Sequence, residues 1–99
     1  MRNEKREAKL DGASLVKNSG RGESKGDAKW KIFLVDYKHY AKTFSLSKAS
    51  WKKMKKDSWN SDHREPLIKV VFDDNSSVAV VDWAWLQWAV EMLEDEGKL

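Results

Sequence analysis

The fold of this 99-residue chain is decided by Gly26-Asp27-Ala28-Lys29-Trp30-Lys31-Ile32-Phe33-Leu34-Val35-Asp36-Tyr37-Lys38. In this stretch an acid follows a glycine, eight residues intervene, and an apolar run then ends in acid-x-lysine. We expect a β-hairpin that turns at Lys31-Ile32. In such a hairpin the two residue numbers of every cross-strand pair add to the same total, which is 63 for this turn. Asp27 therefore lies directly opposite Asp36, with Cβ atoms about 5 Å apart.

The weak point of this hairpin is its turn. Lys-Ile lacks the Gly, Asn or Asp residues that two-residue turns favour. We therefore expect a longer or bulged connection, and the register is open by one residue.

The two carboxylates of this hairpin suggest a metal site. At such a separation they repel each other, which raises the pKa of one of them unless a cation binds between them. Mg²⁺ prefers carboxylate oxygens, and a lysine amine can sit beside an attacking water. Strand alternation places Asp36 and Lys38 on one face. The pattern acid-x-Lys occurs five times in the chain. Only the copy at Asp36 closes an apolar run and also has a second acid, Asp27, on the preceding strand. The hairpin predicts a Mg²⁺ site, open also to Mn²⁺, for cutting phosphodiesters.

Length and composition restrict the class of protein. Ninety-nine residues indicate one small domain spanning residues 1–99. The sequence has no apolar run of about 18 residues for a membrane span, and its N-terminus has no signal-peptide pattern. The absence of cysteine excludes disulfides, zinc–thiolate sites and thiol nucleophiles, and it fits a reducing compartment such as the cytoplasm.

The net charge of +3 hides a strong asymmetry along the chain. Residues 1–59 contain 16 Lys/Arg and 7 Asp/Glu, whereas residues 60–99 contain 3 and 9. A basic half points to a polyanionic partner such as DNA, because lysines that neutralise phosphates release counterions. The alternative is a solvated surface that happens to be basic.

The segments around the hairpin have recognisable signals. We expect a helix at 2–11 that Gly12 stops, an extended segment at 13–16, a Gly/Ser-rich loop at 17–26, and strands at 66–72 and 77–81. The loop contains Lys17, Arg21 and Lys25, which suit phosphate binding, and a flexible surface loop is an equal alternative.

A second helix is expected from a cap at Ser45 or Ser47 to about Trp59. Its inward face should carry Trp51, Met54 and Ser58. Its other face carries lysines at i, i+4, i+7 and i+8, which are Lys48, Lys52, Lys55 and Lys56. We interpret this face as a DNA-backbone contact, with a solubilising surface as the alternative.

The last helix, capped by Asp82, is expected from Trp83 to about Glu94. Its apolar residues cover an arc of about 200° on a helical wheel, and one sheet face covers only about half of that. The excess suggests a homodimer through this C-terminal helix. The alternative is that its tryptophans over-fill a small core.

The order of these motifs resembles a known family. The motifs are Glu4-Lys5-Arg6-Glu7-Ala8-Lys9, Asn18-Ser19-Gly20, Lys25-Gly26-Asp27, Phe33-Leu34-Val35-Asp36-Tyr37-Lys38 and Phe44-Ser45-Leu46. Over roughly residues 2–72 this set resembles the small phage-encoded PD-(D/E)XK nucleases often labelled Holliday-junction resolvases. Glycine stands in place of proline before the first acid, and the second acid is Asp rather than Glu, which shortens its reach.

The resemblance implies an α/β fold with a restriction-endonuclease-like core: an N-terminal helix, a mixed sheet with a central hairpin, and flanking helices. It implies that Asp27 and Asp36 bind metal, that Lys38 positions or activates water, and that Glu4 completes the metal shell. Glu7 competes with Glu4 for that role.

The resemblance also implies the activity. We expect a Mg²⁺-dependent endonuclease that acts as a homodimer on branched DNA, in the host cytoplasm if the chain is phage-encoded. A non-catalytic DNA-binding protein and a nicking or end-processing nuclease of the same fold are the alternatives.

Overall fold

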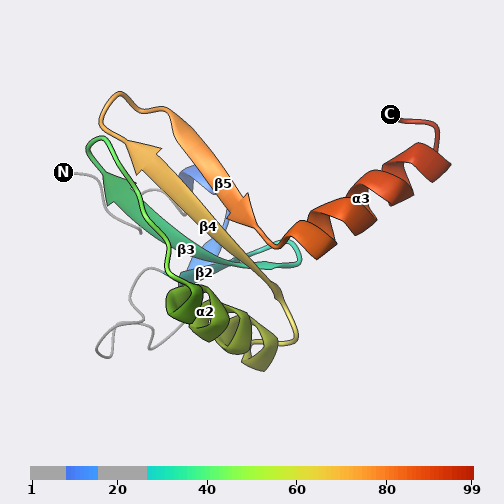
Figure 1. Ribbon diagram of the computed structural model, residues 1–99, viewed down its shortest axis with the longest axis horizontal. Helices are drawn as coiled ribbons and strands as arrows, with labels where there is room; N and C mark the ends of the chain where they lie inside the picture. The colour runs from blue at the N-terminus through green and yellow to red at the C-terminus, as the bar shows by residue number, and fades with distance from the viewer. Residues whose placement is uncertain (1–8, 16–26) are drawn as a thin grey trace.

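The computed structural model describes residues 9–15 and 27–99, apart from the side chains of Leu15 and Asp27 (Figure 1). The protein has an α/β fold built on a five-stranded mixed sheet. The strands in spatial order are β1 (Ser14–Leu15), β2 (Asp27–Trp30), β3 (Phe33–Tyr40), β4 (Glu65–Phe72) and β5 (Ser77–Val81). β3 and β4 run parallel, and the other neighbouring strands are antiparallel. The residue pattern predicted the hairpin, and the resemblance implied the mixed sheet.

The β2–β3 hairpin has the predicted register. Trp30 pairs with Phe33 and Asp27 with Asp36, so the index sum of 63 is confirmed and two residues form the turn. The expectation of a longer or bulged connection was wrong. Lys31 adopts a left-handed conformation with φ 56°. Arg64 Nη1 donates to the Lys31 carbonyl at 2.6 Å, and the Glu65 N–H donates to the Ile32 carbonyl at 2.9 Å. These bonds from distant residues hold a turn that its own sequence does not favour.

Helix α2 (Lys48–Asn60) connects the parallel strands β3 and β4 and lies across one face of the sheet (Figure 1). Of the two predicted caps, Ser45 and Ser47, the structure uses Ser47, whose side chain accepts from the Ser50 N–H at 3.0 Å. Met54 and Ser58 are buried, and Met54 packs with Ile68 and Val70 of β4. The predicted inward face of this helix is confirmed.

The opposite face of the sheet carries a second apolar cluster, formed by Ala28, Phe33, Val35, Tyr37 and Leu67. Residues 9–11 are helical, and the chain leaves this turn at Gly12, where φ is +72° as a helix-stopping glycine allows.

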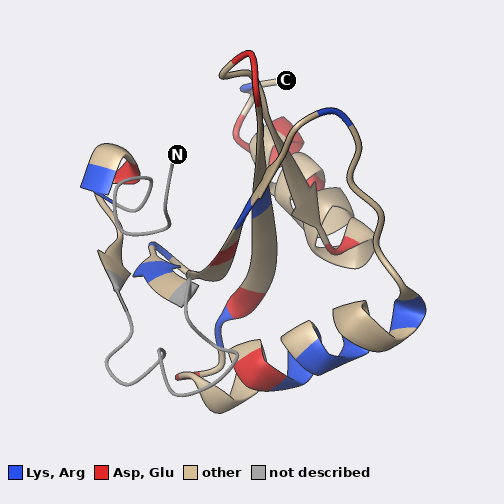
Figure 2. Cartoon of the chain, turned by 90° about the vertical axis from the view of Figure 1, so that its left-hand side faces the viewer, with Lys and Arg blue, Asp and Glu red and all other residues tan. Residues whose placement is uncertain are grey.

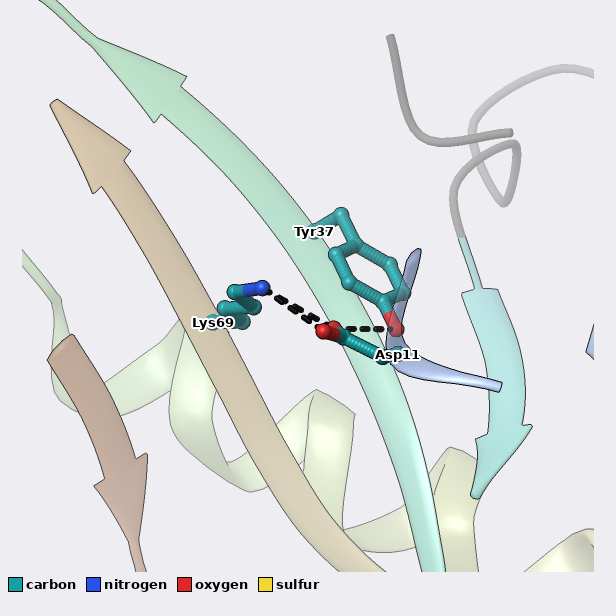
Figure 3. A network of polar contacts seen from close by, with 3 residues as sticks. All are labelled: Asp11, Tyr37 and Lys69. Atoms are coloured by element: carbon teal, nitrogen blue, oxygen red, sulfur yellow. Dashed lines mark hydrogen bonds and ion pairs between the residues drawn. The ribbon is translucent and has the colours of Figure 1, made fainter. Parts of the chain in front are cut away.

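Asp11, at the end of that helical turn, ties it to the sheet (Figure 3). Lys69 Nζ of β4 lies 2.9 and 3.0 Å from the two carboxylate oxygens of Asp11, and the Tyr37 hydroxyl donates to Asp11 at 3.1 Å. Three side chains far apart in sequence thereby fasten the N-terminal segment to β3 and β4.

Helix α3 (Trp83–Asp95) follows β5 and projects away from the sheet (Figure 1). Asp82 caps it as predicted, accepting from the Ala84 N–H at 2.9 Å. Trp85, in its first turn, meets Phe33 edge-to-face with ring centroids 4.9 Å apart. Against the described part of the chain, no residue of α3 is buried.

The expectation that both later helices flank the sheet was therefore wrong for α3. Its contacts with the sheet are made in its first turn, and its axis then leads away from the core. Among the described residues, no helix is long and apolar enough to cross a membrane.

Candidate active site

The candidate site lies on the face of the sheet that α2 covers, here called the α2 face. On β3, Leu34, Asp36 and Lys38 alternate with the residues of the opposite apolar cluster. Asp36 pairs with Ile68 and Lys38 with Val70, and both partners pack toward Met54 of α2. On its other side, the backbone of β3 pairs Asp36 with Asp27. Asp36 therefore lies between β2 on one side and β4, which α2 covers, on the other.

Asp36 and Lys38 contact each other on this face. The distance from Lys38 Nζ to Asp36 Oδ2 is 3.3 Å, and the two side chains are 40% and 26% exposed. A half-exposed pair of this kind is accessible to a ligand, and its attraction is weakened by water. The ammonium group is thereby held beside the carboxylate expected to bind metal.

The remaining predicted ligands lie largely outside the structure. Glu4 and Glu7, and the loop residues Lys17, Arg21 and Lys25, fall outside the described residues, as does the side chain of Asp27. Within residues 9–15 and 27–99, no group of three or more His, Asp or Glu side chains is placed to hold a metal. The donor chemistry nevertheless fits Mg²⁺, because directly paired residues in antiparallel strands have Cβ atoms about 5 Å apart and both residues here are aspartates.

The lysine face of α2 (Lys48, Lys52, Lys55 and Lys56) is exposed along its whole length. Figure 2 shows the basic residues concentrated on this helix. Lys55 differs from the other three, because its Nζ lies 3.2 Å from Oδ2 of Asp82, the cap of α3. The hydrogen bond from Lys55, together with the N–H of Ala84, holds the pKa of Asp82 below its usual range. Lys55 thus joins α2 to α3, a role that the sequence did not suggest.

An aromatic stack at the end of this lysine face was missed by the sequence reasoning. Trp59 is 61% exposed, and its ring stacks on that of His63 with centroids 4.0 Å apart and an interplanar angle of 27°. Trp59 follows Lys52 by seven residues and Lys55 by four, so helical spacing places it on the same face. This helical spacing is the sequence feature that places Trp59 on the lysine face. The left-handed backbone of His63, with φ 55°, brings its ring back onto the helix, and this fold of the chain was not predictable.

Comparison with known proteins finds no family model that matches the chain, no similar curated protein and no similar solved structure.

Proposed function

We propose that this protein is a divalent-metal-dependent endodeoxyribonuclease with a PD-(D/E)XK-like core, acting on branched DNA in phage DNA metabolism. One observation carries the proposal. Asp27 and Asp36 pair directly across the hairpin, and Lys38 lies on the same strand with its ammonium 3.3 Å from Asp36. Two acids and a lysine in this order form the motif that suggested the family.

Each residue of this set has a distinct task. Asp27 and Asp36 would supply carboxylate oxygens for Mg²⁺ or Mn²⁺, and Glu4 or Glu7 would complete the shell. A metal bound there would supply charge stabilisation at the phosphate and a lowered pKa for its bound water. Lys38 has three N–H donors, so it can bind Asp36 and still donate to a phosphate oxygen or to the attacking water. Asp36 also fixes the position of that ammonium group.

The surroundings of the site suit DNA. The Asp36–Lys38 pair lies on the same side of the sheet as α2. One DNA molecule can therefore contact both this pair and the lysines of α2. Lys48, Lys52 and Lys56 supply positive charge for phosphates, and the exposed ring of Trp59 offers a flat surface for an unpaired base. Branched DNA presents both duplex backbone and unstacked bases. Two symmetric cuts at a junction need two copies of the site, so the proposal includes a homodimer through α3.

A non-catalytic DNA-binding protein is the second candidate. The observation that favours it is the Asp36–Lys38 ion pair, because each charge balances the other without a metal. In that case the two residues serve the stability of the hairpin, and the lysines of α2 alone make contact with DNA.

Cleavage assays separate the two candidates. The protein is incubated with four-way-junction, duplex and single-stranded DNA, in Mg²⁺ or in EDTA. The proposal expects metal-dependent cutting that Lys38→Ala removes. The chain offers a matched control, since Glu96 and Lys98 repeat the acid-x-lysine spacing with a 3.3 Å ion pair near the C-terminus. Lys98→Ala should cut normally. Binding without cutting of any substrate in Mg²⁺ or Mn²⁺ would favour the second candidate.

A further inference from the structure

A hollow of about 610 Å³ opens between helices α2 and α3. Lys55 of α2 and His63, just after that helix, lie on one side of it, and Trp85 and Trp88 of α3 lie on the other. Glu65, at the start of β4, lines it as well. Its volume falls in the range of about 300–1,000 Å³ that is usual for small-ligand sites. The hollow is therefore large enough to hold a small organic group.

The two walls of the hollow are tied to each other and to the sheet. Nζ of Lys55 lies 3.2 Å from Oδ2 of Asp82, the cap of α3. The ring of Trp85, in the first turn of α3, meets Phe33 of β3 edge-to-face. The hollow is thus formed by the first turns of α3, where this helix is fastened to the rest of the protein, and not by its projecting end.

The hollow is separate from the apolar surface of α3 that the proposed homodimer uses. With 3.6 residues per turn, Trp85 and Trp88 lie on the side of the helix opposite Leu86 and Val90. Leu86 and Val90 are each 37% exposed, so they can contact a second copy while the hollow stays open. The occupant of the hollow is therefore argued from its own residues.

The hollow is lined by one carboxylate, that of Glu65, without a hydrogen bond or ion pair in residues 9–15 and 27–99. The carboxylate of Asp82, by contrast, is bound by Lys55. Glu65 pairs with Phe33 on the neighbouring parallel strand, so their side chains lie on the same face as the ring of Trp85. An ionised carboxylate repels phosphate and accepts hydrogen bonds from N–H groups. This side of the hollow therefore suits a group rich in N–H donors.

Exposed aromatic rings border the hollow on both sides. Trp88 is 54% exposed on the α3 side. On the α2 side, the ring of Trp59 stacks on His63, which lines the hollow. Such rings bind the flat faces of unpaired bases. Because the lysine face of α2 ends at Trp59, phosphates bound along that face would bring the following base to the hollow (Figure 2). Phosphate and base then each meet groups of suitable charge.

We propose that the hollow binds one unpaired base of the DNA and that Glu65 selects guanine. Guanine presents two N–H groups side by side, at N1 and N2, and one carboxylate can accept both. Adenine and cytosine present one amino group beside a ring nitrogen that repels the carboxylate, and thymine presents one N–H between two carbonyls. Enzymes that bind an extruded base read this same edge. The inference rests on the proposed DNA-binding function and does not depend on cleavage.

The first test measures affinity by fluorescence anisotropy in EDTA, for duplexes that are identical except for one unpaired base. The native protein should bind the duplex with unpaired guanine at least about tenfold more tightly than the uninterrupted duplex. It should also bind unpaired guanine more tightly than unpaired thymine. Trp88→Ala should remove most of this preference. Trp83→Ala makes the same change at a residue of α3 that does not line the hollow, and should keep the preference. Equal affinity of the native protein for unpaired guanine and thymine would overturn the proposal, as would equal losses in the two variants.

The second test changes the preferred base. Glu65→Gln keeps the shape of the side chain but replaces one acceptor oxygen by an N–H donor, which matches the donor and acceptor of adenine. The preference should move from unpaired guanine to unpaired adenine, a change that loss of folding cannot produce. Glu94→Gln removes the same charge from a residue of α3 outside the hollow and should keep the guanine preference. An unchanged guanine preference in Glu65→Gln would overturn the role of Glu65.

The outcomes separate this inference from the proposed function. Metal-dependent cleavage without any preference for an unpaired base would overturn the base site and leave the nuclease. A guanine preference without cleavage in Mg²⁺ or Mn²⁺ would support the base site and remove the nuclease. Acids beside aromatic rings also suit a cationic side chain of a protein partner. If N-acetylarginine amide shifts the indole NMR signal of Trp88 and dGMP does not, the hollow binds such a cation and the proposal is overturned.

Discussion

Helices α2 and α3 have the same length, 13 residues, and similar caps, but they have opposite relations to the sheet. α2 buries Met54 and Ser58, whereas in the described structure α3 buries no residue. α2 is held at both ends, because it connects parallel strands and must lie over them. α3 is joined to the sheet at its N-terminus alone. The two helices have the same length and similar N-terminal caps, so these local features do not decide which helix covers the sheet. The connections of each helix to the strands decide it.

The outward faces of the two helices differ as well. α2 presents lysines and the exposed Trp59, which suit a polyanion with unpaired bases. α3 presents large apolar side chains and acids, which suit a protein surface. We infer a division of tasks, in which the α2 side meets DNA and the α3 side meets a second copy.

The largest effects should come from the site on the α2 face. Asp27→Asn, Asp36→Asn and Lys38→Ala should each lower the cleavage rate on the order of 10²–10³-fold or more, because each removes charge stabilisation or proton-transfer assistance at the reacting phosphate. DNA affinity should stay unchanged or rise for the Asp variants, since a charge that repels phosphate is lost. Gel-shift and cleavage assays measure the two effects. Robust cutting by either Asp variant would remove the metal-site assignment.

The next effect compares the same substitution in the two helices. Met54→Ala removes a buried side chain of α2 and should lower the free energy of unfolding by about 2–4 kcal/mol. Met92→Ala removes a side chain that is 43% exposed, and should change the stability of the monomer by less than about 0.5 kcal/mol. Urea denaturation below the dimer dissociation constant measures both. Equal losses would show that α3 packs on the sheet in solution.

Salt dependence distinguishes the lysines within α2. Replacing Lys48, Lys52 and Lys56 together by alanine should reduce the slope of log affinity for DNA against log salt by about three, or about one for each phosphate contact. Lys55→Ala should change the slope less than any other single variant, because Lys55 is bound to Asp82. Fluorescence-anisotropy titrations at several salt concentrations measure these slopes. An unchanged slope for the triple variant would show that this helix faces away from DNA.

The smallest effect concerns the junction of the two helices. The pKa of Asp82 is lowered, chiefly by the hydrogen bond from Lys55. Its ionised form therefore stabilises the fold above its unfolded pKa of about 3.8, and this contribution is lost as the pH falls through the lower folded pKa. Asp82→Asn keeps a capping side chain but removes the charge. Its melting temperature should lie slightly below native at pH 6, and the difference should shrink as the pH falls below 3.8 toward the lowered pKa of Asp82. A constant difference across this range would exclude the ion pair as the cause.

Much of the local structure follows from sequence alone. The cap at Asp82, both helices, the last two strands and the stop at Gly12 were predicted because each depends on residues close in the chain. The cap of α2 was narrowed to Ser45 or Ser47, and the structure uses Ser47. Counting from a turn at Lys31-Ile32 gave the observed pairing of Asp27 with Asp36, on which the candidate site rests. The sequence left this register open by one residue, because Lys-Ile does not favour a two-residue turn.

Tertiary structure decided what depends on residues far apart. The tight turn at Lys31 is held by Arg64 and Glu65, which follow it by more than thirty positions. The bridges from Lys69 to Asp11 and from Lys55 to Asp82 likewise join separate elements. The direction of α3 depends on where β5 ends and on the contact of Trp85 with Phe33. Local periodicity shows that a helix face is apolar, but the partner of that face is set by the path of the whole chain, because burial is a property of the assembled surfaces.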